Sequence, residues 1–359
     1  MGDALNASIQ IGDRRIGPSH PVYVVAELSA NHGREFARAV ELTRAAKQAG
    51  ADAVKLQTYT ADTITLDCDS DRFRIKGTVW EGRTLYDLYG EAYMPWEWQP
   101  KLKAVADGLG LHLFSTPFDD TAVGFLENMN VPAYKIASFE LVDLPLIRRV
   151  AATGKPMIMS TGMATLGEIE EAVTAAREAG CREIVLLKCT SAYPAPPSEM
   201  NLQTIPHMAQ TFGVPVGLSD HTLGTVAAIA GVALGACIIE KHFTLSRSVP
   251  GPDSAFSLEP HEFKAMVAAV REAGQALGVV RYEPTEREKA SLVFRRSLYV
   301  VADMKAGEPF TRKNVRSIRP GHGLPPKYFD QVLTRRAARD IERGAPLTWQ
   351  DVDIPSPTE

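Results

Sequence analysis

The chain has 359 residues, of which 45% are hydrophobic and 23% are charged, a composition typical of a soluble globular protein. This length is sufficient for one large domain or two smaller ones. With 39 basic and 43 acidic side chains, the formal net charge of −4 gives no general attraction for nucleic acid or an anionic membrane. Any anionic ligand must therefore be held by local cations.

The cysteine pattern and the apolar stretches indicate a cytoplasmic protein. Four cysteines, at positions 68, 181, 189 and 237, show no CxxC spacing. The first residues, MGDALNASIQIGDRR, lack the apolar core of a signal peptide. The longest apolar stretches, such as TVAAIAGVALGACII, are shorter than the ~20 residues that cross a membrane. We therefore expect no membrane contact.

A regular alternation of strand and helix patterns extends to about residue 278, after a hairpin expected at 8–17. Amphipathic segments with 3.6-residue periodicity follow the strands, and several end in glycine. Eight such units predict a (β/α)8 TIM barrel, and no GxGxxG follows the first strand as it would in a doubly wound sheet. The predicted strands are 22–27, 52–57, 111–116, 133–138, 156–161, 183–189, 214–219 and 237–242.

Two segments depart from this alternation. Residues 59–100 form a long, aromatic-rich insertion after the second strand, which we expect to be an ordered lid or specificity element. The polar sequence YEPTEREK separates the barrel from a glycine- and proline-punctuated tail. We therefore predict a barrel over 1–280, a linker over 281–292 and a small β-rich domain over 293–359.

Polar residues end almost every predicted strand, at the face where such barrels carry their chemistry. Lys55 and Lys135 stand in apolar strands, where an ammonium group is costly to desolvate unless an anion compensates it. We expect a phosphate or carboxylate ligand, with an internal ion pair or a Schiff-base lysine as alternatives. Hydroxyls at neighbouring strand ends would complete this site: Thr116, Ser138, Ser160 and Ser219.

His221 and His242 end successive predicted strands, so both imidazoles should point into one mouth. Two histidines without a further histidine or cysteine beside them are too few for a closed zinc site. They suit an open divalent ion such as manganese, completed by water and substrate. The alternative is a metal-free pair of histidine and carboxylate that uses Asp220 or Asp253 as its acidic member.

Taken in chain order, the strand-end segments resemble the sialic acid synthase family, which condenses phosphoenolpyruvate with an amino sugar to give a nonulosonic acid. The resemblance implies a (β/α)8 barrel followed by a small antifreeze-like (SAF) domain. It also implies a domain-swapped homodimer in which each tail closes over the partner's barrel. The matching segments are AELSANH, VKLQTY, STPFD, YKIASFEL, STGMAT, CTSAYP, LSDHT, EKHFT, GPD, FRRSL and RPGHG.

The resemblance further implies a role for each matched residue. His221 and His242 would bind Mn²⁺, with Mg²⁺ or Co²⁺ as alternatives, and Glu27 and Glu140 are the candidate catalytic carboxylates. Phosphoenolpyruvate would be held by Lys55, Thr116, Lys135, Ser138, Ser160 and Ser219. The sugar would face Glu27, Gln57, Tyr193 and Asp253, together with Arg319, which the family sends from the tail into the neighbouring site.

Within the family, the segment GRTLYDLYGEAYMPWEWQPKL is most similar to the pseudaminic acid synthase branch. Leu28 and Ser29 replace the isoleucine-glycine pair usual in sialic and legionaminic acid synthases, and Ser191 replaces an asparagine of sialic acid synthases. This similarity implies 2,4-diacetamido-2,4,6-trideoxy-L-altrose as the sugar and a product for cell-surface glycans, such as those of flagellin. Synthesis of N-acetylneuraminate or legionaminate from another acetamido sugar is the alternative.

Two other classes of function compete with a synthase. A Schiff-base aldolase or lyase would use pyruvate and one desolvated lysine. A binding protein that worked through its antifreeze-like tail would need flat, repeated threonines, whereas this tail has the charged sequences TRKNVRS and RPGHG. These features favour the synthase.

Overall fold

The computed structural model describes residues 7–78 and 80–353, which divide into two compact units with the break between Gly278 and Val279. Each unit has its own hydrophobic core, and we describe the two separately. No helix in the described ranges is both long enough and apolar enough to span a membrane.

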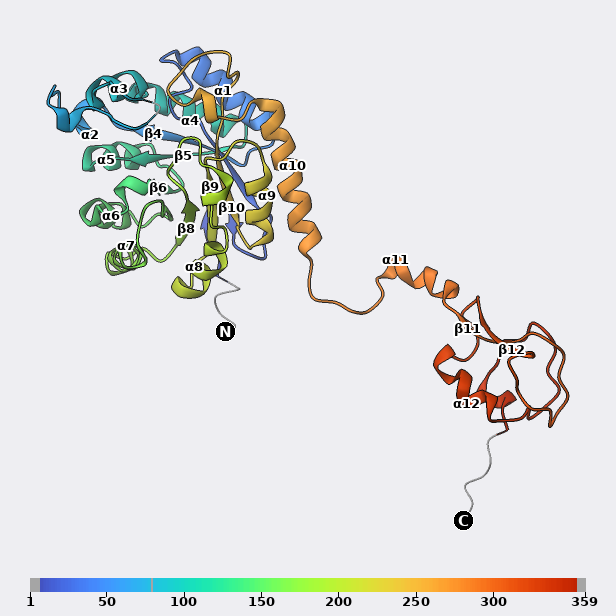
Figure 1. Ribbon diagram of the computed structural model, residues 1–359. Coiled ribbons are helices and arrows are strands. Elements are labelled where there is room, and N and C mark those ends of the chain that lie inside the picture. Colours follow the sequence, from blue (N-terminus) through green and yellow to red (C-terminus); the bar gives the residue numbers. More distant parts are fainter. Residues whose placement is uncertain (1–6, 79, 354–359) are drawn as a thin grey trace. The chain divides into compact units, whose positions relative to one another are not determined.

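In the first unit, eight parallel strands of the described chain close into a barrel, and helices surround it (Figure 1). All eight predicted strands are confirmed, with bounds within two residues of those expected. The last strand pairs with the first, so the sheet has no free edge. The strands are β3 (Tyr23–Glu27), β4 (Ala53–Thr58), β5 (His112–Pro117), β6 (Tyr134–Ile136), β7 (Met157–Ser160), β8 (Ile184–Cys189), β9 (Val216–Asp220) and β10 (Ile238–His242).

The barrel strands are buried on both faces, which explains their nearly continuous apolar sequences. In β3, for example, every residue is buried, including the terminal Glu27. The covering helices pack one apolar stripe onto the sheet, as Ile169, Ala172 and Val173 do in α7. The helices are α1 (Phe36–Gln48), α4 (Gln99–Gly108), α5 (Asp120–Asn128), α6 (Leu144–Ala151), α7 (Leu166–Glu178), α8 (Thr204–Phe212), α9 (Val226–Ala233) and α10 (Pro260–Leu277).

The expected hairpin is present as β1 (Ile9–Ile11) and β2 (Arg14–Ile16), and it lies at the N-terminal end of the barrel strands. The carboxylate of Asp52, just before β4, accepts hydrogen bonds from Arg14 (2.9 Å), Arg271 (3.2 Å) and the backbone N–H of Val24 (2.9 Å). Because these partners come from β2, α10 and β3, Asp52 ties the beginning and the end of the barrel sequence together.

The insertion between β4 and α4 folds into α2 (Ala61–Ile64), α3 (Leu85–Ala92) and two 3-10 turns at Asp71–Phe73 and Trp96–Trp98. Side chains attach it to the barrel. Arg34 donates hydrogen bonds to the carbonyl of Gly90 (2.8 Å) and the hydroxyl of Tyr93 (3.0 Å). The described part of the insertion is therefore a structured element, as we expected.

The second unit begins with a short helix, α11 (Glu286–Lys289), inside the segment expected to be a linker. Thr285 and Glu288 form a capping box there, which the sequence YEPTEREK contains. Beyond it, β11 (Ser297–Val300) and β12 (Val315–Ile318) form an antiparallel ladder, joined by isolated bridges and α12 (Phe329–Leu333). Its core contains Leu298, Val300, Phe310, Val315, Val332 and Leu347.

Candidate active site

The C-terminal ends of the barrel strands bring the predicted polar residues into one mouth. The strand register sets Glu27 opposite Lys55, Gln57 opposite Thr116, and His242 opposite Glu27. Because parallel strands of a barrel end on the same side, residues distant in sequence meet there.

A buried cluster of two lysines and two glutamates forms the floor of this mouth. Lys55 forms an ion pair with Glu27 and lies 3.6 Å from Oε1 of Glu240. Lys135 lies 3.8 Å from the same oxygen and donates a hydrogen bond of 2.6 Å to Ser160. Further polar contacts come from Thr116, 3.5 Å from Lys55, and Ser219, which donates to Glu240 at 3.2 Å.

Burial perturbs the charges of this cluster. It raises the pKa of the Glu27 carboxyl and lowers the pKa of the Lys135 ammonium. Burial also acts to lower the pKa of Lys55, but Glu240 and Glu27 outweigh it and raise that pKa overall. Proton uptake by Glu27 would leave a net positive cluster, which favours an anionic ligand.

Glu240 is a site residue that the sequence analysis missed. Its carboxylate bridges both lysines, so the internal ion pair considered for each lysine is present. The sequence could have identified Glu240, because it precedes His242 by two positions in one predicted strand and must point to the same side of the sheet.

The two predicted histidines lie side by side, with ring centroids 5.3 Å apart. Nδ1 of His221 lies 3.1 Å from the carbonyl oxygen of Thr190, to which it donates in the neutral tautomer, leaving the lone pair on Nε2. Nδ1 of His242 is buried and has no hydrogen-bond partner among the described residues. Burial lowers the pKa of His242 well below its usual value, which keeps the imidazole neutral.

These features fit a divalent ion. A neutral imidazole oriented by a carbonyl is the usual form of a histidine ligand. Sγ of Cys189 lies 3.8 Å from Nδ1 of His221, on the side of the ring away from Nε2, so it is not a further ligand. In residues 7–78 and 80–353, no group of three or more His, Cys, Asp or Glu side chains is arranged to hold a metal. Metal binding by the two histidines stays a prediction.

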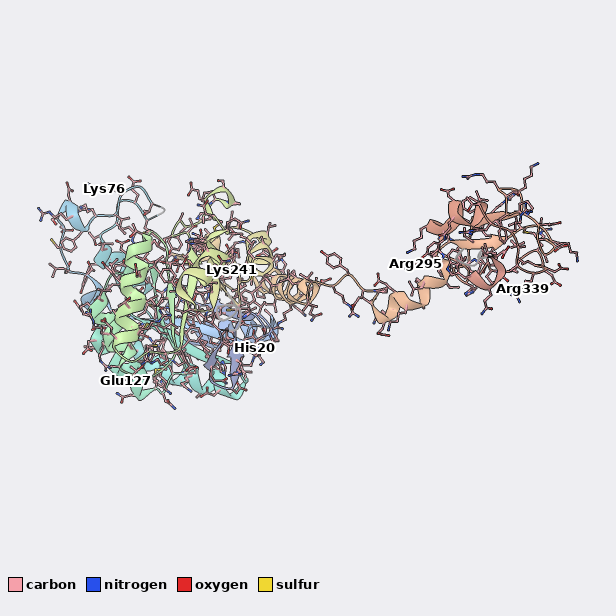
Figure 2. The ribbon with its side chains drawn as sticks, turned by 90° about the horizontal axis from the view of Figure 1, so that it is seen from below. His20, Lys76, Glu127, Lys241, Arg295 and Arg339 are labelled. Atoms are coloured by element: carbon pink, nitrogen blue, oxygen red, sulfur yellow. The ribbon has the colours of Figure 1, made fainter. Side chains whose placement is uncertain are left out.

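The alternative pair of histidine and Asp220 is wrong. Asp220 points away from the mouth, and its Oδ2 lies 2.8 Å from Nζ of Lys241. Lys241 is buried, and in the projection of Figure 2 it lies over the middle of the barrel unit, whereas Lys76 and Glu127 lie at its edge. Asp253 is engaged as well, because its carboxylate accepts hydrogen bonds from Ser29 and, at 3.4 Å, from the N–H of Ala30.

The predicted sugar-facing residues line the mouth beside the histidines. Gln57 donates to Glu27 at 3.2 Å and to Ser29 at 3.0 Å. The ring of Tyr193 packs on His221, with centroids 4.5 Å apart, and contacts Phe256 at 5.3 Å. Ser29 accepts a hydrogen bond from Gln57 and donates one to Asp253, so the three side chains form one hydrogen-bonded group.

The insertion adds an aromatic residue that the sequence analysis did not single out. The indole of Trp80 lies 5.7 Å from the ring of Tyr193, and its Nε1 donates to the carbonyl of Pro252 at 3.1 Å. No sequence pattern marks this contact, because it joins two loops that are 172 positions apart. Trp80 places the insertion at the mouth, as a lid or specificity element requires.

Glu140 and Ser138 lie in the loop after β6. Burial raises the pKa of the Glu140 carboxyl to about 7, although Lys135 opposes the shift. Ser138 accepts a hydrogen bond of 3.1 Å from the N–H of Gly162. A Cβ atom at Gly162 would lie 2.2 Å from Oγ of Ser191, so only glycine fits there. Arg319 is an exposed residue of the second unit, and its place in a neighbouring site stays a prediction.

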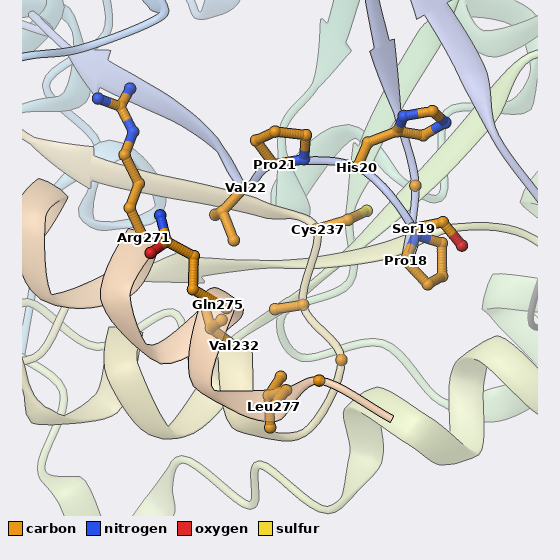
Figure 3. A pocket seen from close by; sticks show the side chains of 15 residues that line it. Pro18, Ser19, His20, Pro21, Val22, Val232, Cys237, Arg271, Gln275 and Leu277 are labelled. Atoms are coloured by element: carbon orange, nitrogen blue, oxygen red, sulfur yellow. The ribbon is translucent and has the colours of Figure 1, made fainter. Parts of the chain in front are cut away.

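A separate cavity of about 420 Å³ lies at the N-terminal end of the barrel, between the segment before β3 and the end of α10. Figure 3 shows His20, Arg271 and Gln275 among its lining side chains. None of the predicted site residues lines it. The candidate active site is therefore the opposite, C-terminal mouth.

Two family models match the chain. Residues 42–282 match the model of the NeuB family, and residues 295–353 match the SAF domain. The chain belongs to the NeuB family. Its fold, a TIM barrel followed by a SAF domain, is the one that the resemblance implied.

Similar proteins carry synthase names. The chain is 45% identical to pseudaminic acid synthase of Campylobacter jejuni serotype O:23/36, over 96% of this chain and 99% of the relative. It is 44% identical to pseudaminic acid synthase of Helicobacter pylori, over 93% and 98% of the two chains. A crystal structure of N-acetylneuraminic acid synthetase from Leptospira borgpetersenii, in complex with citrate, aligns with a TM-score of 0.71 at 30% identity, over 79% and 95% of the chains.

Proposed function

We propose that this protein is a pseudaminic acid synthase, which condenses phosphoenolpyruvate with 2,4-diacetamido-2,4,6-trideoxy-L-altrose to give pseudaminic acid and phosphate. The reaction makes it a transferase that breaks the C–O bond of phosphoenolpyruvate. The observation that carries the proposal is the buried pair of lysines next to the two histidines, in a chain 45% identical to named pseudaminic acid synthases.

Phosphoenolpyruvate binds over the lysine cluster in this proposal. Lys55 and Lys135 neutralise its phosphate and carboxylate in a buried site, where such electrostatic contributions are large. The hydroxyl groups of Thr116, Ser138, Ser160 and Ser219 provide the remaining hydrogen bonds. The sugar binds above them, against Gln57, Tyr193 and Asp253, and Arg319 arrives from a second copy of the chain.

His221 and His242 hold a divalent ion, for which we propose Mn²⁺, with Mg²⁺ or Co²⁺ as alternatives. When bound, such an ion supplies Lewis-acid polarisation of the sugar aldehyde. The protein's own part is to orient His221 through the Thr190 carbonyl and to keep His242 neutral by burial, while Cys189 raises the pKa of His221.

Two carboxyl groups are placed to move protons. C3 of phosphoenolpyruvate forms a bond to the aldehyde carbon, whose oxygen gains a proton. Water then adds to C2 and loses a proton, and the resulting C2 hydroxyl gives up its proton to the departing phosphate as the C2–O bond to phosphate breaks, which leaves a ketone at C2. Glu140, whose pKa is raised to about 7, suits proton transfer near neutral pH, and Glu27 is the other candidate.

Exposed apolar residues around the mouth support a homodimer in which the SAF domain of a second copy closes the site. Phe139, Val142, Met163, Leu166, Leu223 and Val226 lie in the loops or helix starts after β6, β7 and β9, and each is more than half exposed. Exposed apolar patches of this kind are typical of interaction surfaces. We propose a cytoplasmic enzyme whose product enters cell-surface glycans, such as those of flagellin.

The test is to incubate the protein with phosphoenolpyruvate, Mn²⁺ and each of several acetamido sugars, and to measure phosphate release and product mass. The proposal expects the altrose derivative to be the best substrate. Preference for N-acetylmannosamine or the legionaminate precursor would replace it with one of the alternative synthases. Borohydride trapping of a pyruvate adduct on Lys135 would instead establish a Schiff-base enzyme, and unchanged mass after that treatment agrees with the synthase.

A further inference from the structure

Asp220 and Lys241 form an ion pair in the layer between the barrel and its helices. Their side chains have no exposed surface, and Nζ of Lys241 lies 2.8 Å from Oδ2 of Asp220. The two residues are direct partners in the register of β9 and β10. The pair therefore fixes two neighbouring strands at one level.

Thr222 completes the hydrogen bonding of this pair. Its backbone N–H and its hydroxyl donate to Oδ1 of Asp220, at 2.9 and 2.8 Å. Its carbonyl accepts a hydrogen bond from Lys241. Lys241 thus holds the chain on both sides of His221, through the side chain of Asp220 and through the peptide of Thr222.

The position of the pair in the strands relates it to the histidines. Adjacent residues of a strand point to opposite faces, so Asp220 and Lys241 point outward while His221 and His242 point into the mouth. Each charged residue precedes one of the histidines in sequence. Any rotation or slip between β9 and β10 would move both imidazoles, whose centroids lie 5.3 Å apart.

An ion pair is a costly way to fill this layer. Apolar residues of similar volume would give equal or greater stability, whereas removing one partner leaves an unpaired buried charge. The charged pair can instead define the register of β9 and β10, because the ion pair and the hydrogen bonds of Thr222 form together only when the two strands are aligned as they are here.

We propose that the Asp220–Lys241 ion pair is a positioning device that holds His221 and His242 at the separation a divalent ion requires. The inference rests on the proposed function, since it assumes that these histidines bind the ion. Asp220 and Lys241 are positioning residues, because their side chains do not reach the mouth.

The experiment measures Mn²⁺ binding to purified, substrate-free protein by calorimetric titration and by the EPR signal of the free ion, together with thermal unfolding. The variants are Asp220→Asn, Lys241→Met and the double variant of both. Arg14→Met is the matched control, because it breaks an ion pair with Asp52 at the other end of the barrel. His221→Ala gives the background of non-specific binding.

We expect the Mn²⁺ affinity of each single variant to fall by roughly tenfold or more, because mutations of residues that orient metal ligands typically have effects of this size. The double variant should recover much of the unfolding temperature, because no charge is left unpaired, but it should not recover Mn²⁺ affinity. Arg14→Met should unfold at a lower temperature and bind Mn²⁺ as the wild type does.

Two results would overturn the inference while leaving the proposed function intact. One is wild-type Mn²⁺ affinity in the double variant. The other is an equal loss of affinity in Arg14→Met, which would make the effect one of general stability. If the wild-type protein binds no more Mn²⁺, Mg²⁺ or Co²⁺ than His221→Ala does, the metal site itself is refuted, and the positioning role falls with it.

Discussion

Oε1 of Glu240 lies 3.8 Å from Nζ of Lys135, deep in the mouth of the barrel. The same oxygen lies 3.6 Å from Lys55, so a single carboxylate balances two buried ammonium groups. An incoming dianion must compete with this internal counter-charge. The lysines are therefore ordered before the ligand arrives, which lowers the entropic cost of binding.

Replacing Lys135 should impair the use of phosphoenolpyruvate more than the use of the sugar. Lys135→Met removes a cation of the cluster and leaves the hydroxyl of Ser160 without its donor. We expect kcat/KM for phosphoenolpyruvate to fall by about 100-fold or more, as for other buried electrostatic contacts. Steady-state kinetics with each substrate varied in turn checks this, with the partly exposed Lys155→Met as control. A change confined to the KM of the sugar would refute the assignment.

Glu140 should make the stability of the substrate-free protein depend on pH. Burial raises its folded-state pKa to about 7 from its ordinary value of 4.5, so its contribution is fully present below pH 4.5 and is lost as the pH rises through 7. The neutral variant Glu140→Gln should therefore be more stable than the wild type at pH 8, by up to about 3 kcal/mol, and nearly equal at about pH 4. Chemical denaturation at both pH values measures the difference. An equal difference at both would show that Glu140 titrates normally.

Removal of the metal should stop turnover without unfolding the protein. Chelation followed by gel filtration should abolish phosphate release, and Mn²⁺ should restore it in the wild type. His221→Ala should have no activity with or without Mn²⁺, while its circular dichroism spectrum stays that of the wild type. Near-normal rates in this variant, or full activity after exhaustive chelation, would contradict the metal role.

Trp80 should contribute to recognition of the sugar. Trp80→Ala removes the indole that packs on Tyr193 and the hydrogen bond to Pro252. We expect the KM of the sugar to rise by about tenfold, since a buried aromatic contact contributes on the order of 1 kcal/mol and its loss also loosens the insertion. Trp80→Phe keeps a ring and should recover part of the affinity. Unchanged sugar kinetics in Trp80→Ala would show that the insertion acts elsewhere.

The fold follows from the sequence because its strands are buried on both faces and its helices on one. This contrast produces short apolar runs and longer amphipathic segments, which predicted the bounds of β3 to β10 within two residues. His221 and His242 were predicted for the same reason, since a polar residue directly after an apolar run indicates the end of a buried strand.

The partners of these residues could not be predicted in the same way. Asp220 stands next to His221 in the chain, which suggested a shared function, yet strand alternation turns the two side chains to opposite faces. Trp80 meets Tyr193 only through the folding of two loops. Contacts of this kind depend on tertiary packing and leave no periodic signal.

The pairing of β10 with β3 has a consequence for the synthesis of the protein. Without β10, β3 and β9 would each have one unpaired edge, and Asp52 would also lack Arg271 of α10, which follows β10 in the chain. The strand that closes the barrel also carries Glu240 and His242. A chain that stops short of β10 therefore exposes sheet edges and has only one of the two histidines, so closure of the barrel and pairing of the histidines depend on the same strand.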